Sequence, residues 1–265
     1  MGAYAVLISD ESIDYTALGQ ALAKAKKMPF QDAIPVARKC GGLIEEDMEA
    51  EAAEALAADL KGAGLDARAV AQDSLARLPP ALPVKTLALG EGSFRITLEG
   101  NETLDVPLDT IALVAAAAFT VSTEKTVVTQ EGSGAAAKAL EKTLRMATMM
   151  PIKFTKETKI QKRGETDLLL YMDLYLRDPA KRLRMDSAAL DYRFLGEKMT
   201  YSSLTNFRLL VQGMAKLAAS AVLNMGTKII AENRPMREMA YASLDDLDRE
   251  SRCILSVRGD APPKR

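Results

Sequence analysis

Histidine is absent from this chain of 265 residues, and cysteine occurs only at Cys40 and Cys253. Without imidazole, the chain has no side chain whose ordinary pKa lies near neutral pH, so only a strongly perturbed group could titrate there. Ser-His-Asp and Cys-His catalysis are therefore excluded, and two cysteines cannot complete a tetrahedral zinc site. Carboxylate chemistry, lysine chemistry and magnesium bound by oxygen ligands remain open.

Disulfide frameworks and long apolar runs are also missing. The two cysteines lie too far apart in the sequence to suggest a disulfide scaffold, so we interpret each as a small buried hydrophobic residue in a reducing compartment. The longest apolar run covers residues 111–119, whereas a membrane-spanning helix needs about 20 residues. The first residues carry no basic, apolar signal pattern. We therefore expect a cytoplasmic protein without a transmembrane segment.

Residues 1–76 are predicted to form one α/β module. Helical spacing of apolar residues, the N-cap Asp14 and the helix-ending pair Gly41-Gly42 define its elements. The expected elements are a strand at residues 5–8, a helix at 14–27, a helix from Pro29 to 40, a strand at 43–44, a helix at 48–60 and a strand at 65–71. The order is β-α-α-β-α-β.

Landmarks of a known family follow one another within this module. They are the break at Met28-Pro29, the helix start Phe30-Gln31-Asp32-Ala33, the turn into Leu43-Ile44-Glu45-Glu46, and the segments Ala53-Glu54-Ala55-Leu56 and Leu60-Lys61-Gly62-Ala63-Gly64. With this nearly gapless spacing, residues 16–70 resemble the C-terminal domain of the bacterial large-subunit ribosomal stalk protein. The resemblance covers only the first part of the chain and implies a shared fold.

The surface through which that family recruits translation factors is not reproduced. In the family it is a basic, glycine-containing surface on the first two helices. Here Met28-Pro29 replaces the glycines, and Gln20 and Ala23 stand near where basic residues are expected. Pro35 falls inside the second helix, which we predict it kinks or shortens. The resemblance therefore does not extend to factor binding.

The proline-rich residues 77–83 are predicted to be a linker, followed by an antiparallel β domain over residues 84–257. The hairpin signals Gly90-Glu91-Gly92 and Gly100-Asn101 separate its first strands. The expected strands lie at residues 84–89, 93–98, 103–107, 111–121, 167–176 and 183–192, and the expected helices at 203–226, 227–233 and 243–255. Strands followed by a long amphipathic helix are typical of pleckstrin-homology-like barrels. The predicted fold class is α+β.

Residues 122–166 are predicted to be a basic, methionine-rich insert within the β domain. Residues 138–163 contain eight basic and two acidic side chains. A hinge at 132–134 precedes an expected helix whose methionines widen its apolar face and suit an irregular protein surface. The candidate partner-binding residues are Lys138, Lys142, Arg145, Met146, Met149, Met150, Lys153, Lys156, Lys159, Lys162 and Arg163.

The insert has a plainer interpretation, in which the helix covers the sheet and its lysines are solvated. Docking onto the acidic N-terminal module and binding to an anionic lipid surface are further alternatives. Nucleic acid is disfavoured because Phe154 is the only aromatic residue among the lysines, so no stacking platform is formed.

A second candidate site joins Arg182, Arg184, Arg193 and Tyr201 near the end of the predicted sheet. Arginine forks suit carboxylate or phosphate ligands, but they serve equally well in interior ion pairs. No other motif carries catalysis, because Gly90-Glu91-Gly92 reads as a turn and Ser122-Thr123-Glu124-Lys125 as a strand end. We expect no catalytic residues, metal or cofactor.

The sequence thus favours a non-enzymatic protein-binding, scaffolding or adaptor protein that engages an acidic or amphipathic partner through the insert. The principal alternative is a carboxylate- or lysine-dependent enzyme with a pocket between its domains. Acidic or basic side chains with shifted pKa values in a deep cleft would favour that alternative.

Overall fold

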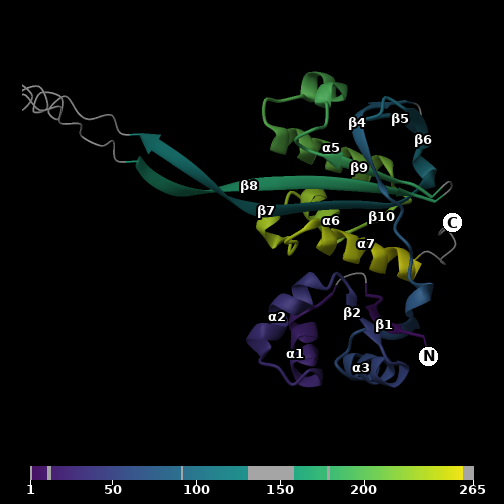
Figure 1. Cartoon of the computed structure of the whole chain (residues 1–265). Coiled ribbons are helices and arrows are strands. Elements are labelled where there is room, and N and C mark those ends of the chain that lie inside the picture. The colour runs from purple at the N-terminus through teal and green to yellow at the C-terminus, as the bar shows by residue number, and fades with distance from the viewer. Residues whose placement is uncertain (1, 11–12, 91, 131–157, 178–179, 259–265) are drawn as a thin grey trace, which may run out of the picture. The chain divides into compact units, whose positions relative to one another are not determined.

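The structure is a computed structural model that describes residues 2–10, 13–90, 92–130, 158–177 and 180–258, with the backbone alone at 122–130 and 158–166. The fold class is α+β, as expected (Figure 1). The chain divides into two compact units, residues 1–119 with 169–265 and residues 120–168.

The N-terminal module has the predicted order β-α-α-β-α-β. Its elements are β1 (Tyr4–Ile8), α1 (Tyr15–Ala25), α2 (Phe30–Lys39), β2 (Leu43–Met48), α3 (Ala50–Gly62) and β3 (Ala67–Ala71). The three strands form an antiparallel sheet in the order β2-β1-β3. Asp14 caps α1 as predicted, because its carboxylate accepts hydrogen bonds from the backbone N–H groups of Thr16 at 2.9 Å and Ala17 at 3.1 Å.

The helices of this module pack on one face of the sheet through their apolar stripes. Leu18 and Leu22 of α1 are fully buried, as is Leu60 of α3. Helix α2 continues through Pro35 to Lys39, so the prediction that this proline shortens the helix is wrong. Its missing N–H removes one backbone hydrogen bond, which burial of the flanking residues 33 and 37 against the core offsets.

A second sheet has seven strands in the order β10-β7-β8-β9-β4-β5-β6. The strands are β4 (Ala81–Leu89), β5 (Ser93–Leu98), β6 (Thr103–Pro107), β7 (Ile111–Gln130), β8 (Thr158–Leu176), β9 (Arg182–Asp186) and β10 (Val222–Leu223). β5 and β6 match their predicted positions, and β4 matches at its end, because hairpin turns lie between β4 and β5 and between β5 and β6.

The prediction of an antiparallel sheet is wrong. β4 pairs with β9 in parallel through residues 81–83, and β10 pairs with β7 in parallel. The prolines of residues 77–83 suggested a linker, yet residues 81–83 belong to β4 because β9 supplies them with a pairing edge. The resulting sheet is mixed and open, with β10 and β6 at its edges, which differs from an antiparallel barrel.

The compact unit of residues 120–168 lies within two residues of the predicted insert, 122–166, but the predicted ends of the two strands that flank the insert are wrong. β7 continues nine residues beyond the predicted end at Val121, and β8 begins nine residues before the predicted start at Asp167. The predicted strands end where the runs of apolar residues end. β7 and β8 continue as a two-stranded ribbon, which can pair without a buried apolar face, so the apolar pattern does not mark the ends of the strands. The predicted hinge and the predicted helix lie outside the described residues.

Helical elements follow β9 in the chain. They are η3 (Tyr192–Lys198), α5 (Ser203–Leu217), α6 (Met225–Ala231), η4 (Met236–Glu238) and α7 (Leu244–Arg258). The helix predicted for residues 203–226 ends at Leu217, because residues 222–223 leave the helix to pair with β7. The strand predicted for residues 183–192 ends at Asp186, and Tyr192 is the first residue of η3.

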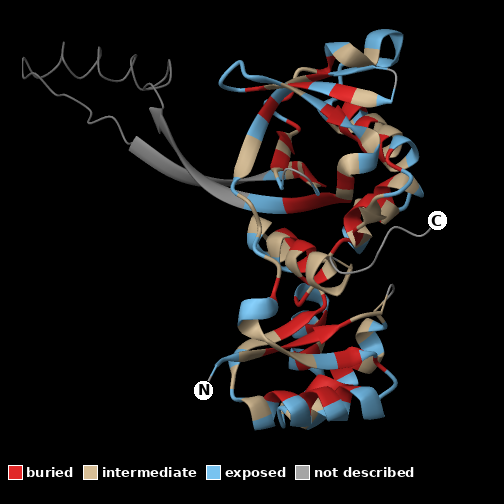
Figure 2. Cartoon of the chain, turned by 90° about the vertical axis from the view of Figure 1, so that its right-hand side faces the viewer, coloured by how far each residue is buried: buried red, intermediate tan, exposed pale blue. Residues whose placement is uncertain are grey.

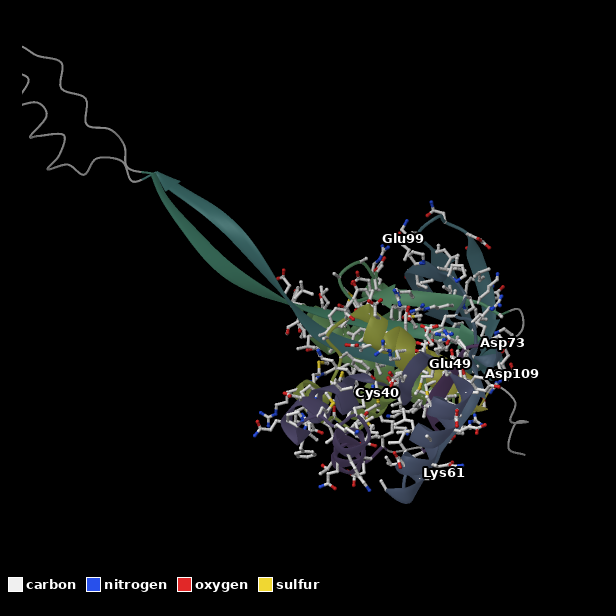
Figure 3. The ribbon with its side chains drawn as sticks, turned by 60° about the horizontal axis from the view of Figure 1, so that its bottom comes forward. Cys40, Glu49, Lys61, Asp73, Glu99 and Asp109 are labelled. Atoms are coloured by element: carbon white, nitrogen blue, oxygen red, sulfur yellow. The ribbon has the colours of Figure 1, made fainter. Side chains whose placement is uncertain are left out.

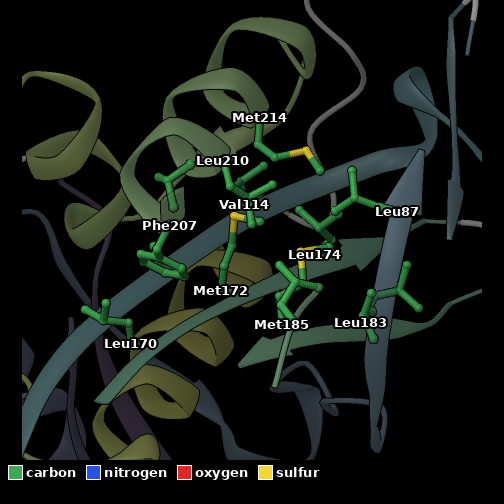
Figure 4. Close-up of a cluster of buried hydrophobic side chains, with 14 of the residues drawn as sticks. Leu87, Val114, Leu170, Met172, Leu174, Leu183, Met185, Phe207, Leu210 and Met214 are labelled. Atoms are coloured by element: carbon green, nitrogen blue, oxygen red, sulfur yellow. The ribbon is translucent and has the colours of Figure 1, made fainter. Parts of the chain in front are cut away.

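Helices cover both faces of the larger sheet (Figure 1). On one face, Phe207, Leu210 and Met214 of α5 pack on apolar side chains of β7, β8 and β9 (Figure 4). On the other face, Leu247 of α7 packs against Tyr175. Burial on both faces explains the uninterrupted apolar run at residues 111–119, which is almost wholly buried (Figure 2).

Helix α7 also contacts the N-terminal module. Cys253 is buried with Leu7 and Leu43 of the small sheet, and its thiol lies 3.6 Å from the carbonyl oxygen of Ile8. Arg252 forms an ion pair with Glu46 at 2.5 Å. Side chains of one helix, α7, are therefore buried against both sheets.

Candidate functional site

The residues predicted to bind a partner lie mostly outside the described part of the chain. Those concerned are Lys138, Lys142, Arg145, Met146, Met149, Met150, Lys153 and Lys156. Lys159, Lys162 and Arg163 lie in β8, in the part where the backbone alone is described. The partner-binding site therefore stays a prediction.

The backbone on either side of these residues is a two-stranded ribbon. β7 and β8 are hydrogen-bonded neighbours, and both pass from the larger compact unit into residues 120–168. The described pairing of β10 reaches only Leu113 and Val114, and that of β9 only residues 171–175. No third strand is paired with the ribbon at residues 120–130 or 158–168 within the described chain.

Arg182 and Arg184, of the second predicted site, are brought together on β9 around a fully buried carboxylate. Asp173 of β8 lies directly opposite Arg184 in the register. Its Oδ2 accepts from Arg182 Nη2 at 2.6 Å and from Arg184 Nη2 at 2.8 Å, and its Oδ1 accepts from Arg184 Nε at 2.9 Å. Asp248 of α7 bonds to both guanidinium groups from the half-exposed side.

Aromatic rings complete this cluster. The Arg182 guanidinium lies 5.3 Å from the ring centre of Tyr175, and that of Arg184 lies 5.8 Å from the ring centre of Tyr171. Although burial disfavours the charged guanidinium, hydrogen bonds to Asp248 and Asp173 raise the pKa of Arg182 above its ordinary value. With two arginines facing two aspartates, the cluster is an internal ion-pair network rather than an open anion site.

Arg193 and Tyr201, the other two residues of that predicted site, have different surroundings. Arg193 is exposed and pairs with Asp191, whose Oδ2 accepts from its Nε at 2.7 Å. Tyr201 is fully exposed. The sequence proximity that grouped the four residues therefore does not correspond to one site.

A second buried polar site, which the sequence analysis missed, surrounds Glu250 of α7. Its Oε2 accepts from the Tyr241 hydroxyl at 2.5 Å and the Asn224 amide at 2.9 Å, and its Oε1 accepts from the backbone N–H of Met225 at 3.1 Å. Desolvation raises the pKa of Glu250, although these hydrogen bonds and the charge of Lys228 oppose the shift. Burial also raises the pKa of Tyr241, well above its usual value.

The loop that carries Asn224 is attached to β7 by hydrogen bonds between the Asn224 side chain and the backbone of Ala116. The Asn224 Oδ1 accepts from the N–H of Ala116 at 2.9 Å, and its Nδ2 donates to the carbonyl oxygen of Ala116 at 3.0 Å. A Cβ at Gly226 would lie 1.9 Å from that same carbonyl oxygen. Only glycine fits at this approach.

A small cavity borders Glu250. It has a volume of about 70 Å³. Its lining residues come from the N-terminal module and from the C-terminal helices, and include Asp10, Tyr15, Gly42, Lys228 and Glu250. Ligand sites usually measure about 300–1,000 Å³, so this cavity has room for a few water molecules and not for an organic substrate. The pattern of charged residues resembles that expected of the enzyme alternative, but the size does not.

Both cysteines are buried and unpaired, as expected. Cys40, labelled in Figure 3, lies at the end of α2 and its thiol donates to the carbonyl oxygen of Ala37 at 3.1 Å. Burial raises the pKa of Cys40 to about 11 and that of Cys253 to about 12. Both thiols therefore stay protonated and poorly nucleophilic at neutral pH.

Within the described chain, no three acidic or cysteine side chains gather as metal ligands would. None of the helices in that part combines the length and the apolar character that crossing a membrane requires.

Comparison of the chain with protein-family models, with curated proteins and with solved structures gives no match.

Proposed function

We propose that this is a non-enzymatic binding or scaffolding protein that engages an acidic or amphipathic protein partner through the ribbon of β7 and β8 and the insert that joins them. The observation that carries the proposal is the continuation of both strands into a compact unit of their own, residues 120–168. A core-forming sheet does not need this extension.

The energetics of an isolated ribbon support a binding role. Two strands alone are marginally stable in water, and strand edges without neighbours offer N–H and C=O groups for pairing with another chain. Between residues 120 and 168 the sequence has nine basic and six acidic side chains, and the excess is concentrated at 138–163. An acidic partner would gain both backbone pairing and charge attraction.

Replacing residues 131–157 by a short Asn-Gly loop tests the proposal. Partner capture by the tagged protein should be lost, while the thermal unfolding midpoint of the remaining protein stays unchanged. A full-length variant with Lys138, Lys142 and Arg145 changed to glutamate separates charge from length, and it should lose capture as well. Retention of the same partners by both variants would refute the proposal.

We also propose that residues 1–76 share the fold of the stalk-protein domain they resemble, without its factor-binding role. The observed order of elements supports the first part, because it is the order that the resemblance implies. The unpaired, buried cysteines support a reducing compartment such as the cytoplasm.

The enzyme alternative draws on Glu250, which is buried with a raised pKa beside Asp10 and Lys228. The 70 Å³ volume of the adjoining cavity weighs against it. The lipid-surface alternative draws only on the basic residues, and flotation with anionic vesicles over a salt series tests it. Binding that survives removal of residues 131–157 would exclude the insert as its cause.

A further inference from the structure

An apolar groove lies on the larger sheet beside α5, separate from the ribbon and from both charged clusters. Its volume is about 380 Å³, within the range of small-molecule sites. Leu87 and Phe94 of the sheet, together with Leu210 and Met214 of α5, form a buried floor. Leu87, Leu210 and Met214 are labelled in Figure 4. At the rim, Leu89 is 58% exposed and Leu217 is 40% exposed.

The groove has a charge pattern of one sign. Two lysines line it, Lys198 at the end of η3 and Lys216 in the last turns of α5, and no acidic side chain is among its described lining residues. The remaining polar group, the amide of Gln212, donates to the side chain of Asn233 at 2.8 Å. An occupant that satisfies this lining has an apolar body and a negative end.

Gly213 of α5 is one of the residues that line the groove. Glycine within a helix costs about 0.5–1 kcal/mol relative to alanine. In this structure a Cβ at Gly213 would meet nothing within 4 Å, so neither packing nor backbone conformation demands glycine there. Because there is open space at this position, a larger side chain can be introduced here to test whether the groove is a binding site.

We propose that this groove binds a medium-chain fatty acid, with the alkyl chain along α5 and the carboxylate at Lys198 and Lys216. The proposal is independent of the role proposed for the ribbon. The open rim gives the chain access, and the buried floor gives it an apolar surface to cover. Surface lysines attract a carboxylate only modestly, so the alkyl chain supplies most of the affinity.

Titration calorimetry with hexanoate, octanoate and decanoate, each below its micelle concentration, tests the proposal on the full chain. The dissociation constant should fall about fourfold for each added methylene, as expected for transfer of a CH₂ group from water. Decyltrimethylammonium, which has the same chain and the opposite charge, should bind more weakly than decanoate. Equal or tighter binding of the cation, or no binding of decanoate, would overturn the proposal.

The variant Gly213→Leu fills the groove and should weaken decanoate binding at least tenfold, without lowering the thermal midpoint. Gly62→Leu is its matched control, because Gly62 also lies in a helix, α3, and a Cβ there also meets nothing within 4 Å. If Gly213→Leu fails to fold, Gly213→Ala and Gly213→Val give a graded series. Unchanged decanoate binding in the folded variants would contradict the assignment.

The double variant Lys198→Gln/Lys216→Gln tests the anionic end. Decanoate binding should weaken roughly two- to fivefold, the effect of losing exposed charge pairs, whereas binding of 1-decanol should not change. Lys61→Gln, in α3 (Figure 3), controls for a general loss of positive charge. An equal loss for decanol and decanoate would refute recognition of the carboxylate.

Discussion

Two buried sites beside α7 each contain a buried carboxylate, and they compensate its desolvation in different ways. In the first, Asp173 is fully buried between Arg182 and Arg184, and Asp248 balances the second arginine. In the second, Glu250 accepts hydrogen bonds from the neutral groups of Asn224, Tyr241 and the Met225 backbone. In the first site the charge of the carboxylate is compensated by opposite charges. In the second the carboxylate is stabilised only by the dipoles of neutral hydrogen-bond donors.

The difference appears in how each site should respond to protonation. In the arginine cluster burial disfavours the charged guanidinium groups, but the hydrogen bonds and charges of Asp173 and Asp248 raise the pKa of Arg182 and of Arg184 above the ordinary value. Neutral donors compensate a buried carboxylate less completely, so desolvation prevails and the pKa of Glu250 is raised. The arginine cluster is therefore suited to constant structure, whereas the Glu250 site makes the stability of the fold depend on pH.

The largest effect is expected from breaking the arginine cluster. Asp173→Asn leaves two largely buried guanidinium groups with only Asp248, and removal of one partner from a buried ion pair typically costs about 3–5 kcal/mol. Urea unfolding at neutral pH measures the loss. The triple variant Asp173→Leu/Arg182→Met/Arg184→Met removes the charges of these three side chains, leaves only the part-exposed Asp248 of the cluster, and should recover most of that loss. A single variant as stable as the native protein would show that the pairs are not energetically coupled.

A smaller loss is expected from removing the support of Glu250. Asn224→Ala deprives the carbonyl oxygen of Ala116 of its side-chain donor and Glu250 of one donor, while the Thr227 hydroxyl still accepts from the Ala116 N–H. We expect the variant to cost about 2–3 kcal/mol, because buried groups are left unsatisfied. Urea unfolding again provides the measurement. Thr205→Ala, at an exposed site in α5, is a control whose unfolding should change little. A loss below that of the control would mean that water replaces the amide without cost.

Glu250→Gln should change the pH dependence more than the stability at any one pH. An unfolded Glu titrates near pH 4.3 and the folded Glu250 titrates higher. Its stabilising contribution is therefore complete below about pH 4.3 and is lost as the pH rises through the folded pKa. The stability of the variant relative to the native protein should increase from pH 4 to pH 8 in urea unfolding. A constant difference across this range would contradict a raised pKa.

The smallest effect is expected from the exposed pair. Asp191→Asn removes the carboxylate that Arg193 contacts on the surface, but the variant amide can still cap the N–H of Arg193. Solvent and salt screen such pairs, so the unfolding midpoint should not change measurably in 0.15 M salt. A loss as large as that of Asp173→Asn would remove burial as the basis of the comparison.

The elements of the N-terminal module follow from its sequence because turns, caps and helical periodicity agree there. Asp14 caps its helix and glycines follow Cys40, so local signals suffice. In the larger sheet, pairing partners are remote: β4 meets β9 about a hundred residues later in the chain, as the pairing of Ala81 with Arg182 shows. Local patterns carry no information on such pairing, so the parallel arrangement could not be predicted.

The sequence contains part of the information needed to predict the two charged clusters. Arg182 and Arg184 are two of the four residues that the sequence groups as a candidate site. Asp173 interrupts the apolar residues 168–176 on the strand face that also carries Tyr175. Glu250 falls three residues after the buried Leu247 and one before the buried Ser251, so it lies on the inward face of α7. A charge on a buried face predicts a compensated site, but its partners come from distant segments and only the fold identifies them.

The side-chain amide of Asn224 has a consequence for self-association. By pairing with both backbone groups of Ala116, it occupies the place that a neighbouring strand would take beside β7. Its neighbour Thr227 accepts from the same N–H and donates to the carbonyl oxygen of Val114. Edge groups engaged in this way are unavailable to template the addition of another molecule's strand. Loss of Asn224 should therefore promote β-type aggregation as well as unfolding, beginning at residue 116.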